Sequence, residues 1–326
     1  MMFIPIPAMH IPDGFLNVPV AVVGWALIVV VIGFALRQTR NQLGERQIPL
    51  MGILAAFIFA AQMINFPVAG GTSGHLIGGM LAAVLLGPWA AVLVMTSVVA
   101  VQALLFQDGG LLVLGFNIFN MGIVSVFVGY AAYDWIRKAL NNTRTAQLVG
   151  AAVGAWLGVL AAAIAASLEL AVSGTSPLEV VLPAMVGVHI LIGIGEALIT
   201  VAAVAFIQQT RPDLTGAAAA VEARGSTWIA VGLVLALVVV LVSPLANPNP
   251  DGLERVAEDH GFIEAAEDPP YEVIPDYQAP FIEDEALATI VAGVIGVVIV
   301  AAVGWGVSRL SGRSAAHDEP TSAQGP

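Results

Sequence analysis

The chain has 326 residues, a formal net charge of −12, and 58% hydrophobic but only 10% charged residues. Soluble globular domains carry about 25% charged residues, so a chain this poor in charge cannot cover its surface with polar groups. The composition excludes an ordinary soluble enzyme and a disordered chain, and it favours a polytopic membrane protein. Nucleic acid is bound by clustered Lys and Arg, so the acidic balance also argues against a nucleic-acid partner.

Two kinds of chemistry are excluded by single residue types. The chain has no cysteine, which excludes disulfides and thiolate metal sites. Its one lysine, Lys138, follows Asp134-Trp135-Ile136-Arg137 instead of lying in a glycine-rich phosphate-binding loop. An ATP-driven function would therefore need another subunit to hold the nucleotide.

Apolar segments follow one another along the chain, and a spanning helix needs about 20 mostly apolar residues. We expect helices over residues 18–36, 50–66, 76–86, 88–105, 111–133, 146–172, 180–208, 228–245 and 286–307. Gly87-Pro88 separates the third segment from the fourth, and such a pair is a natural helix break. Seven segments precede a polar connector at 209–227, and two follow it.

Basic residues orient these segments, because cytoplasmic loops collect Lys and Arg. If residues 76–105 cross the membrane twice, every base except Arg255 falls in a cytoplasmic loop or tail. If they cross once, five bases move outside, namely Arg137, Lys138, Arg144, Arg211 and Arg224. We therefore predict an all-α polytopic membrane protein with about nine transmembrane segments, its N-terminus outside and its C-terminus cytoplasmic.

Two histidines fall on the outer side of this topology, where they can share a metal ion. His10 lies in Met9-His10-Ile11-Pro12-Asp13-Gly14, and His75 follows Gly71-Thr72-Ser73-Gly74. Thr72 or Ser73 is placed to cap a helix that His75 begins, and both residues are candidates to support the site without binding the ion or to couple it to a partner. Pro12-Asp13-Gly14 is typical of a turn, from which Asp13 would support the site without binding the ion. A hydrogen-bonded surface histidine and a plain capped loop fit the same residues.

A chain that began at Met9 would offer a stronger chelate. Its free amine, the His10 backbone nitrogen and the His10 imidazole can hold one ion through two fused rings, and a second imidazole completes a plane of four nitrogens. Tetragonal nitrogen coordination suits Ni²⁺ and Cu²⁺ and can hold Co²⁺. Binding in this way requires loss of the backbone proton.

Several motifs resemble those of a known family. Met9–Leu16 resembles the N-terminal motif of the CbiM/NikM family, the metal-capturing membrane subunits of cobalt and nickel energy-coupling-factor transporters. Further family motifs resemble, in order, Gly71–Leu76, Gln102–Gly110, Gly115–Gly122 and His189–Thr200. In addition, Pro250-Asp251-Gly252-Leu253-Glu254 resembles the PDGLE domain, which is similar to the small accessory subunit of these transporters.

The resemblance implies a division of the chain and a ligand set. Residues 9–208 would form the metal-binding membrane domain, 228–310 the PDGLE domain with an acidic outer loop at 246–285, and 311–326 a polar tail. The metal would be held by the Met9 amine, by the backbone and side-chain nitrogens of His10, and by His75. Because a peptide-bonded Met9 has no free amine, we expect residues 1–8 to be a non-native or removed extension.

Polar side chains also lie inside the predicted spans. His189 and Glu196 share one helix face, and an intramembrane ionisable residue is a functional candidate by default. We expect Glu196, which lies deep in its helix, to pack, bond a neighbouring helix or couple to a partner, and we expect His189 to lie beside the ligands. Asn117, Asn120 and Gln102 resemble polar groups that join helices, and a role at the site stays open for them.

The leading prediction is a non-enzymatic capture subunit of an ATP-driven cobalt or nickel uptake transporter in the cell membrane, with cobalt preferred as the family's common ion. The resemblance implies a membrane coupling subunit and cytoplasmic ATPases as partners. A self-sufficient secondary transporter would need buried acids as carriers, of which the spans offer little beyond Glu196 and Glu169. A third alternative, an intramembrane metalloenzyme, lacks a His-Glu-x-x-His pattern.

Nearly all of the net charge belongs to one loop. Residues 246–285 carry twelve acidic residues and one arginine, so they contribute −11 of the −12. We expect this loop to be a solvated, flexible outer segment with His260 exposed, and its acids to concentrate cations near the site.

Overall fold

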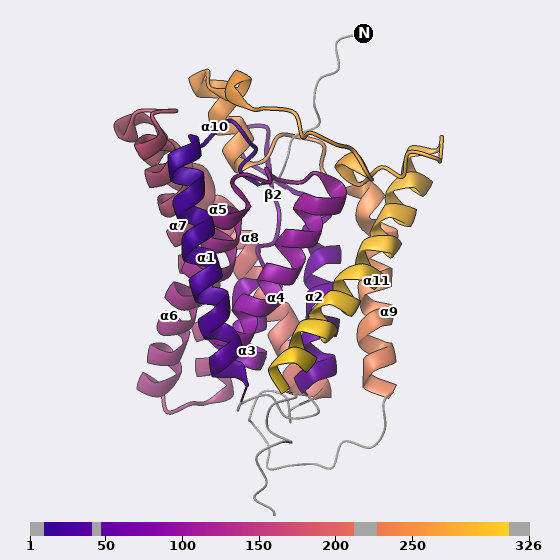
Figure 1. The fold of residues 1–326 in the computed structure, drawn as a ribbon. Helices are drawn as coiled ribbons and strands as arrows, with labels where there is room; N and C mark the ends of the chain where they lie inside the picture. The colour runs from indigo at the N-terminus through magenta and orange to yellow at the C-terminus, as the bar shows by residue number, and fades with distance from the viewer. Residues whose placement is uncertain (1–9, 41–46, 212–226, 313–326) are drawn as a thin grey trace, which may run out of the picture.

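The computed structural model describes residues 10–40, 47–211 and 227–312, and most of them lie in helices whose axes run roughly parallel (Figure 1). The calls on residues 1–8 and Met9, and on most of the connector and tail, lie outside these ranges. The first part of the chain forms α1 (Val18–Thr39), α2 (Gln47–Gln62), β1 (Phe66–Val68), β2 (Thr72–Gly74), α3 (Gly79–Leu86), α4 (Pro88–Val101), η1 (Gln102–Phe106), α5 (Leu114–Ile118), η2 (Phe119–Val124), α6 (Ser125–Ala139), α7 (Arg144–Ser173) and α8 (Leu178–Thr210). The second part forms α9 (Thr227–Val242), η4 (Ser243–Leu245), α10 (Gly252–His260), η5 (Ile263–Ala265), η6 (Pro275–Tyr277) and α11 (Glu285–Gly312).

Each predicted segment contains a helix, but the helices differ in length. Among the described residues, six helical stretches are long and apolar enough to cross a membrane, and they lie at 18–39, 88–106, 114–139, 144–173, 178–210 and 285–309. The helices at 47–62 and 229–245 are apolar but shorter, and α3 has eight residues. A polytopic membrane protein is therefore supported, while nine crossings and their orientation stay predictions.

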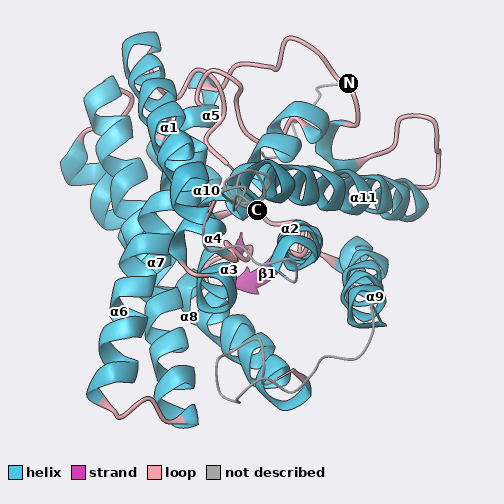
Figure 2. Cartoon of the chain, turned by 60° about the horizontal axis from the view of Figure 1, so that its bottom comes forward, coloured by secondary structure: helices cyan, strands magenta, loops and turns pink. Residues whose placement is uncertain are grey.

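The all-α prediction needs one correction. Residues 66–74 form a short antiparallel hairpin that packs against α8, with Phe66 opposite Gly74 and Val68 opposite Thr72 (Figure 2). The third helix accordingly begins at Gly79 and not at residue 76. The residues from His75 to Ile77 belong to neither a helix nor a strand, and Gly78, in a left-handed conformation, directly precedes α3.

The predicted break at Gly87-Pro88 is confirmed. Gly87 has φ +82° and ends α3, and Pro88 is the first residue of α4. Proline suits that position because the first helical N–H has no partner within the helix. The break lets α4 turn into the centre of the bundle, where most of its side chains are buried.

The outer faces of the bundle are apolar. Large side chains of α1, α8 and α11, among them Val30, Leu198 and Val298, are exposed. An exterior of this kind suits the hydrocarbon of a bilayer. The core lies around α2, α3 and α4, whose buried side chains form one continuous apolar cluster.

The acidic loop differs from the expectation of a flexible segment. It contains α10, which begins at Asp251 with reciprocal hydrogen bonds between Asp251 and Glu254 and buries Leu253, Val256 and Ala257. This helix lies on α8, while α9 and α11 pack against α2. Its apolar face packs against α8, whereas Glu258, Asp259 and His260 are exposed. His260 is exposed, as predicted.

Candidate metal centre

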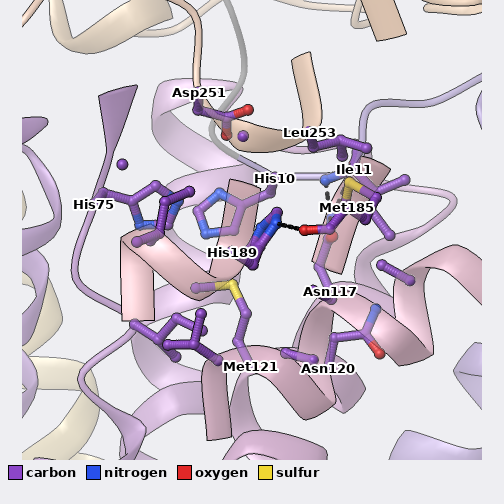
Figure 3. Close-up of a pocket in the computed structure, with 18 residues that line it drawn as sticks. His10, Ile11, His75, Asn117, Asn120, Met121, Met185, His189, Asp251 and Leu253 are labelled. Carbon is purple, nitrogen blue, oxygen red and sulfur yellow. Dashed lines mark hydrogen bonds between the residues drawn. The ribbon is translucent and has the colours of Figure 1, made fainter. Parts of the chain in front are cut away.

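A pocket beneath α10 is lined by both parts of the chain (Figure 3). The histidines at its rim are His10, His75 and His189, and Asp251 lies above them (Figure 3). Asn117, Asn120, Met121 and Met185 also line the pocket. The structure thus brings together both predicted histidine ligands and three of the predicted supporting residues.

The orientation of the His10 imidazole is set by the carboxylate of Asp108, which the sequence did not single out. His10 is 3% exposed, and its Nδ1 donates to Asp108 Oδ1 at 2.7 Å. Its Nε2 is buried without a hydrogen-bond partner among the described residues. The rings of His10 and His75 have centroids 5.7 Å apart. Because metal–nitrogen bonds are about 2 Å long, one ion fits between rings at this separation.

Charge and burial act against each other at this pair. Burial disfavours the charged imidazole, but the charge and hydrogen bond of Asp108 outweigh it and raise the pKa of His10 above its usual value. Burial likewise disfavours the Asp108 carboxylate, yet His10 and the Tyr277 hydroxyl hold the pKa of Asp108 below its usual value. Asp108 therefore stays ionised beside the imidazole.

Asn117 holds the backbone next to His10. Its Oδ1 accepts from the Ile11 N–H and its Nδ2 donates to the Ile11 carbonyl, each at 3.0 Å. Gly109 has φ +91°, and a Cβ there would lie 2.8 Å from the Cβ of His10. The absence of a side chain at Gly109 thus lets the Asp108 loop approach His10.

Asp13 binds the backbone of the loop that follows Asp108. Its carboxylate accepts from the backbone N–H groups of Leu111, Leu112 and Val113 at 3.0, 2.9 and 3.3 Å. These three bonds fix the segment that follows Asp108. A supporting role for Asp13 agrees with this placement and stays a prediction.

Glu196, which we expected to pack, to bond a neighbouring helix or to couple to a partner, bonds the backbone that follows His75. Glu196 on α8 accepts from the Ile77 N–H at 2.6 Å and from the Gly78 N–H at 2.9 Å. The chain between β2 and α3 runs beside α8, so its N–H groups lie within reach of Glu196. Glu196 therefore bonds the backbone just beyond His75.

The predicted capping role of Thr72 and Ser73 is wrong, because α3 begins at Gly79 and not at His75, while their supporting role stays a prediction. Both residues are buried in β2. Ser73 instead joins the two parts of the chain, since its N–H donates to the Pro250 carbonyl at 2.8 Å and its Oγ to the Asn249 carbonyl at 2.7 Å. These two hydrogen bonds join β2 to Asn249-Pro250, directly before α10.

The remaining predicted residues lie beside the two histidines. His189 is half-buried at the pocket, and its Nδ1 donates to the Met185 carbonyl at 2.7 Å. Asn120 lines the pocket and donates to Glu169 at 2.8 Å. Among the described residues, no three His, Asp or Glu side chains are arranged to hold one ion. The Met9 amine lies outside them and stays a prediction.

Sequence reasoning missed Asp108, Asp251 and Tyr277 as site residues. Asp108 lies within the Gln102–Gly110 motif, and Asp251 lies in the PDG run, so both stood in segments already singled out. Tyr277 had no such signal. Gln102, whose role was left open, donates to the Tyr277 hydroxyl at 3.1 Å.

Comparison with known proteins assigns both parts of the chain. Residues 10–214 match the CbiM family model, described as a cobalt uptake substrate-specific transmembrane region, and residues 226–313 match the PDGLE domain.

Single relatives and a solved structure agree with these matches. The chain is similar to a putative fused nickel transport protein, NikMN, of Archaeoglobus fulgidus (39% identity over 92% of this chain and 98% of the relative). It is also similar to the cobalt transport protein CbiM of Sorangium cellulosum (34% identity over 63% and 94%). A crystal structure described as a truncated transition metal transporter has 37% identity and a TM-score of 0.56 over 62% of this chain and 99% of that one. The chain therefore belongs to the CbiM family of metal transport proteins and carries a PDGLE domain behind its CbiM region.

Proposed function

We propose that this multi-pass membrane protein captures Ni²⁺ or Co²⁺ outside the cell membrane for uptake. The observation that carries the proposal is the buried Nε2 of His10, which faces a pocket shared with His75 and has no hydrogen-bond partner among the described residues. A carboxylate on the far nitrogen of a histidine is the usual support of a metal-ligating imidazole. Nitrogen ligands suit both ions.

We propose His10 and His75 as the side chains that receive the ion, with Met9 adding nitrogen from outside the described residues. The fused-ring chelate predicted above would use Nδ1 of His10, because only that atom closes a six-membered ring with the backbone nitrogen. In the structure Nδ1 is bonded to Asp108. Capture through Nε2 leaves that bond intact, whereas the chelate requires the ring to turn away from Asp108.

The names of two relatives suggest the order in which the ions should be tested. The fused relative that matches 92% of this chain is named a nickel transport protein, and a shorter relative that matches the CbiM region is named a cobalt transport protein. Because the fused form matches both parts of this chain, we propose Ni²⁺ as the first ion to test and Co²⁺ as the second.

We further propose that uptake is ATP-driven, in an energy-coupling-factor transporter with a membrane coupling subunit and cytoplasmic ATPases. The test is uptake of radioactive Ni²⁺ by cells that produce this chain with and without the ATPase subunits. Uptake only with the ATPases supports the proposal. Uptake that survives their removal would favour a self-sufficient secondary transporter.

Nine crossings with the N-terminus outside complete the proposal, and the two shorter apolar helices together with α3 would supply the crossings beyond the six long ones. The chain has no cysteine, so single cysteines report on topology without interference. A cysteine at Asn141, between α6 and α7, should react with a membrane-impermeant reagent only from inside. A cysteine at Thr175, between α7 and α8, should react only from outside.

A further inference from the structure

The C-terminal part of the chain contributes one charged side chain to the metal pocket. Among the described residues that line this pocket, Asp251 is the one carboxylate, and it belongs to the PDGLE region. The histidines of the pocket belong to the CbiM region. In the close-up view the carboxylate lies above the rings of His10 and His189 (Figure 3). One region therefore supplies a negative charge to a pocket whose imidazoles come from the other.

Asp251 also begins α10, and this role occupies one of its two carboxylate oxygens. Its Oδ1 accepts from the Glu254 N–H at 2.8 Å, and its own N–H donates to the Glu254 carboxylate at 3.2 Å. Asp251 is 4% exposed, and no described residue donates a hydrogen bond to its Oδ2. An ionised carboxylate accepts at both oxygens. The cap of α10 thus leaves Oδ2 available to a cation in the pocket.

Hydrogen bonds fix Asp251 relative to His75. The Ser73 N–H donates to the Pro250 carbonyl at 2.8 Å, and the Ser73 hydroxyl donates to the Asn249 carbonyl at 2.7 Å. Ser73 lies two residues before His75, and the two carbonyls belong to the residues directly before Asp251. The hairpin and the start of α10 therefore hold the carboxylate and the imidazole at the same pocket.

Close packing on α8 fixes the first turn of α10 from the other side. A Cβ at Gly252 would lie 2.9 Å from Cε1 of His189, so the absence of a side chain there lets the helix approach the histidine. The helix α10 lies at the end of the bundle that the predicted topology places outside (Figure 1). An ion that enters from the side of α10 therefore meets Asp251 before the imidazoles beneath it.

Asp251 stands over the histidines without joining them in one ligand set. Among the described residues, no three His, Asp or Glu side chains are arranged to hold one ion. The ring centroids of His10 and His75, by contrast, lie 5.7 Å apart. Nickel and cobalt ions bind imidazole nitrogen well, whereas carboxylate oxygen suits harder ions such as Mn²⁺. A carboxylate so placed suits first contact with the ion, and the imidazoles suit its final binding.

We infer that Asp251 is a transit ligand, whose carboxylate binds the incoming divalent ion at the α10 side of the pocket and passes it to the histidines. The docked PDGLE region would thereby speed metal capture. The inference rests on the proposed function, since it takes His10 and His75 as the final ligands, but it is independent of which His10 nitrogen binds. A transit ligand lowers the barrier to both entry and exit, so it changes the rates more than the affinity.

The first test is the rate of Ni²⁺ capture by Asp251→Asn in the full chain. Asparagine caps a helix as well as aspartate does, so it keeps α10 and removes the charge. Stopped-flow mixing with Ni²⁺ and a metal indicator should show association about tenfold slower, as expected when a cleft loses its attracting charge. The equilibrium affinity should change less than this rate.

Two further variants separate the charge from the helix that carries it. Asp251→Ser also caps α10 without a charge, and it should slow association as Asp251→Asn does. Glu258→Gln is the matched control, because it removes an exposed charge from the same helix and should leave the rate unchanged. Hydrogen exchange at the Ser73 amide shows whether α10 stays docked in each variant.

The second test looks for the ion at Asp251 itself. In a chain with both His10→Ala and His75→Ala the final site is removed, and paramagnetic Mn²⁺, which prefers oxygen ligands, serves as the probe. It should broaden the amide NMR signals of Gly252 and Leu253. Addition of Asp251→Asn should abolish this broadening, whereas addition of Glu258→Gln should preserve it. Where a variant speeds exchange at the Ser73 amide, α10 has moved, and this second test decides.

Three results would overturn the inference: a parental association rate in Asp251→Asn, a loss of affinity caused by faster dissociation alone, or Mn²⁺ broadening at Gly252 that persists in Asp251→Asn. His10→Ala and His75→Ala separate the inference from the proposed function. If both of these variants keep their Ni²⁺, the proposed function fails. If they lose it while Asp251→Asn captures Ni²⁺ at the parental rate, only the inference fails.

Discussion

The Nδ1 of His10 and the Oδ1 of Asp108 lie 2.7 Å apart, although 98 residues separate them in the chain. Both groups are buried, so the interaction is weakly screened by water. This contact decides which nitrogen of His10 faces the pocket. It also ties a loop before α1 to the loop after η1, and the first prediction concerns it.

Asp108→Asn should weaken metal binding by about 10- to 100-fold, the range for loss of a carboxylate behind a ligating histidine. Asparagine keeps the size and an acceptor oxygen but loses the charge. Calorimetric titration of the purified chain with Ni²⁺ checks the prediction. Asp134→Asn is a suitable control, because Asp134 pairs with Arg137 and Lys138 on α6, away from the pocket. An Asp108→Asn chain with parental affinity would contradict the role given to this carboxylate.

Metal affinity should depend on pH through His10. Burial opposes protonation of His10, but Asp108 outweighs it and raises the pKa of His10 above its usual value. A proton and a metal ion compete for the same imidazole. Affinity should therefore fall as the pH drops through the raised pKa of His10, and Asp108→Asn should move that fall to lower pH.

The metal-free protein should respond in the opposite sense. A histidine whose pKa is raised on folding stabilises the folded state in acid, and this stabilisation is lost as the pH rises through the raised pKa. Binding isotherms and melting curves between pH 5 and 8 measure both effects. An affinity that does not change over this range would contradict the assignment of His10 as a ligand.

Glu196→Ala should destabilise the fold and loosen His75. The substitution leaves the N–H groups of Ile77 and Gly78 without their acceptor, and each unpartnered buried donor costs about 1–3 kcal/mol. We expect a lower melting temperature and weaker metal binding, with Glu196→Gln intermediate because it keeps one acceptor oxygen. Glu179→Gln, at an exposed position of the same helix, is the control. Equal melting temperatures for Glu196→Ala and the control would contradict this role.

Gly252→Ala should push α10 away from α8. A Cβ at Gly252 would lie 2.8 Å from Ile192 Cδ1 and 2.9 Å from His189 Cε1, and because both side chains are packed beneath α10, we expect the helix to give way as well as the side chains. Displacement of α10 strains the bond from the Ser73 N–H to Pro250, and the Ser73 amide should exchange its hydrogen faster. Gly187→Ala is the matched control, because nothing lies within 4 Å of a Cβ there. Unchanged exchange at Ser73 would contradict close docking of α10.

The helices were predictable because their apolar length is a local property of the sequence. Gly87-Pro88 marked its break for the same reason, since a left-handed glycine and a proline act within one turn. The hairpin at 66–74 was not predicted, because its three-residue strands are too short to show alternation. The bonds from Ile77 and Gly78 to Glu196 were missed for the same reason, because they depend on where the chain runs after the hairpin.

Only those site residues that stand in distinctive local motifs could be predicted from the sequence. His10 and His75 stood in distinctive local sequences, whereas Tyr277 touches Asp108 across 169 residues. Nothing local in Pro275-Asp276-Tyr277 points to that contact. The helix α10 was not predicted either, because loop 246–285 is so acidic that it reads as a solvated segment. Its residues Leu253, Val256 and Ala257 form a buried face only when the helix lies on α8.

The central claim is that His10 and His75 hold a transition-metal ion. The most direct measurement is elemental analysis of the purified full chain loaded with Ni²⁺ and dialysed, beside His10→Ala, His75→Ala and the exposed control His260→Ala, with mass spectrometry of each N-terminus. We predict about one metal ion per chain in the parent and in His260→Ala, strong loss in the other two, and a chain that begins at Met9. Parental metal content in both His10→Ala and His75→Ala would contradict the account.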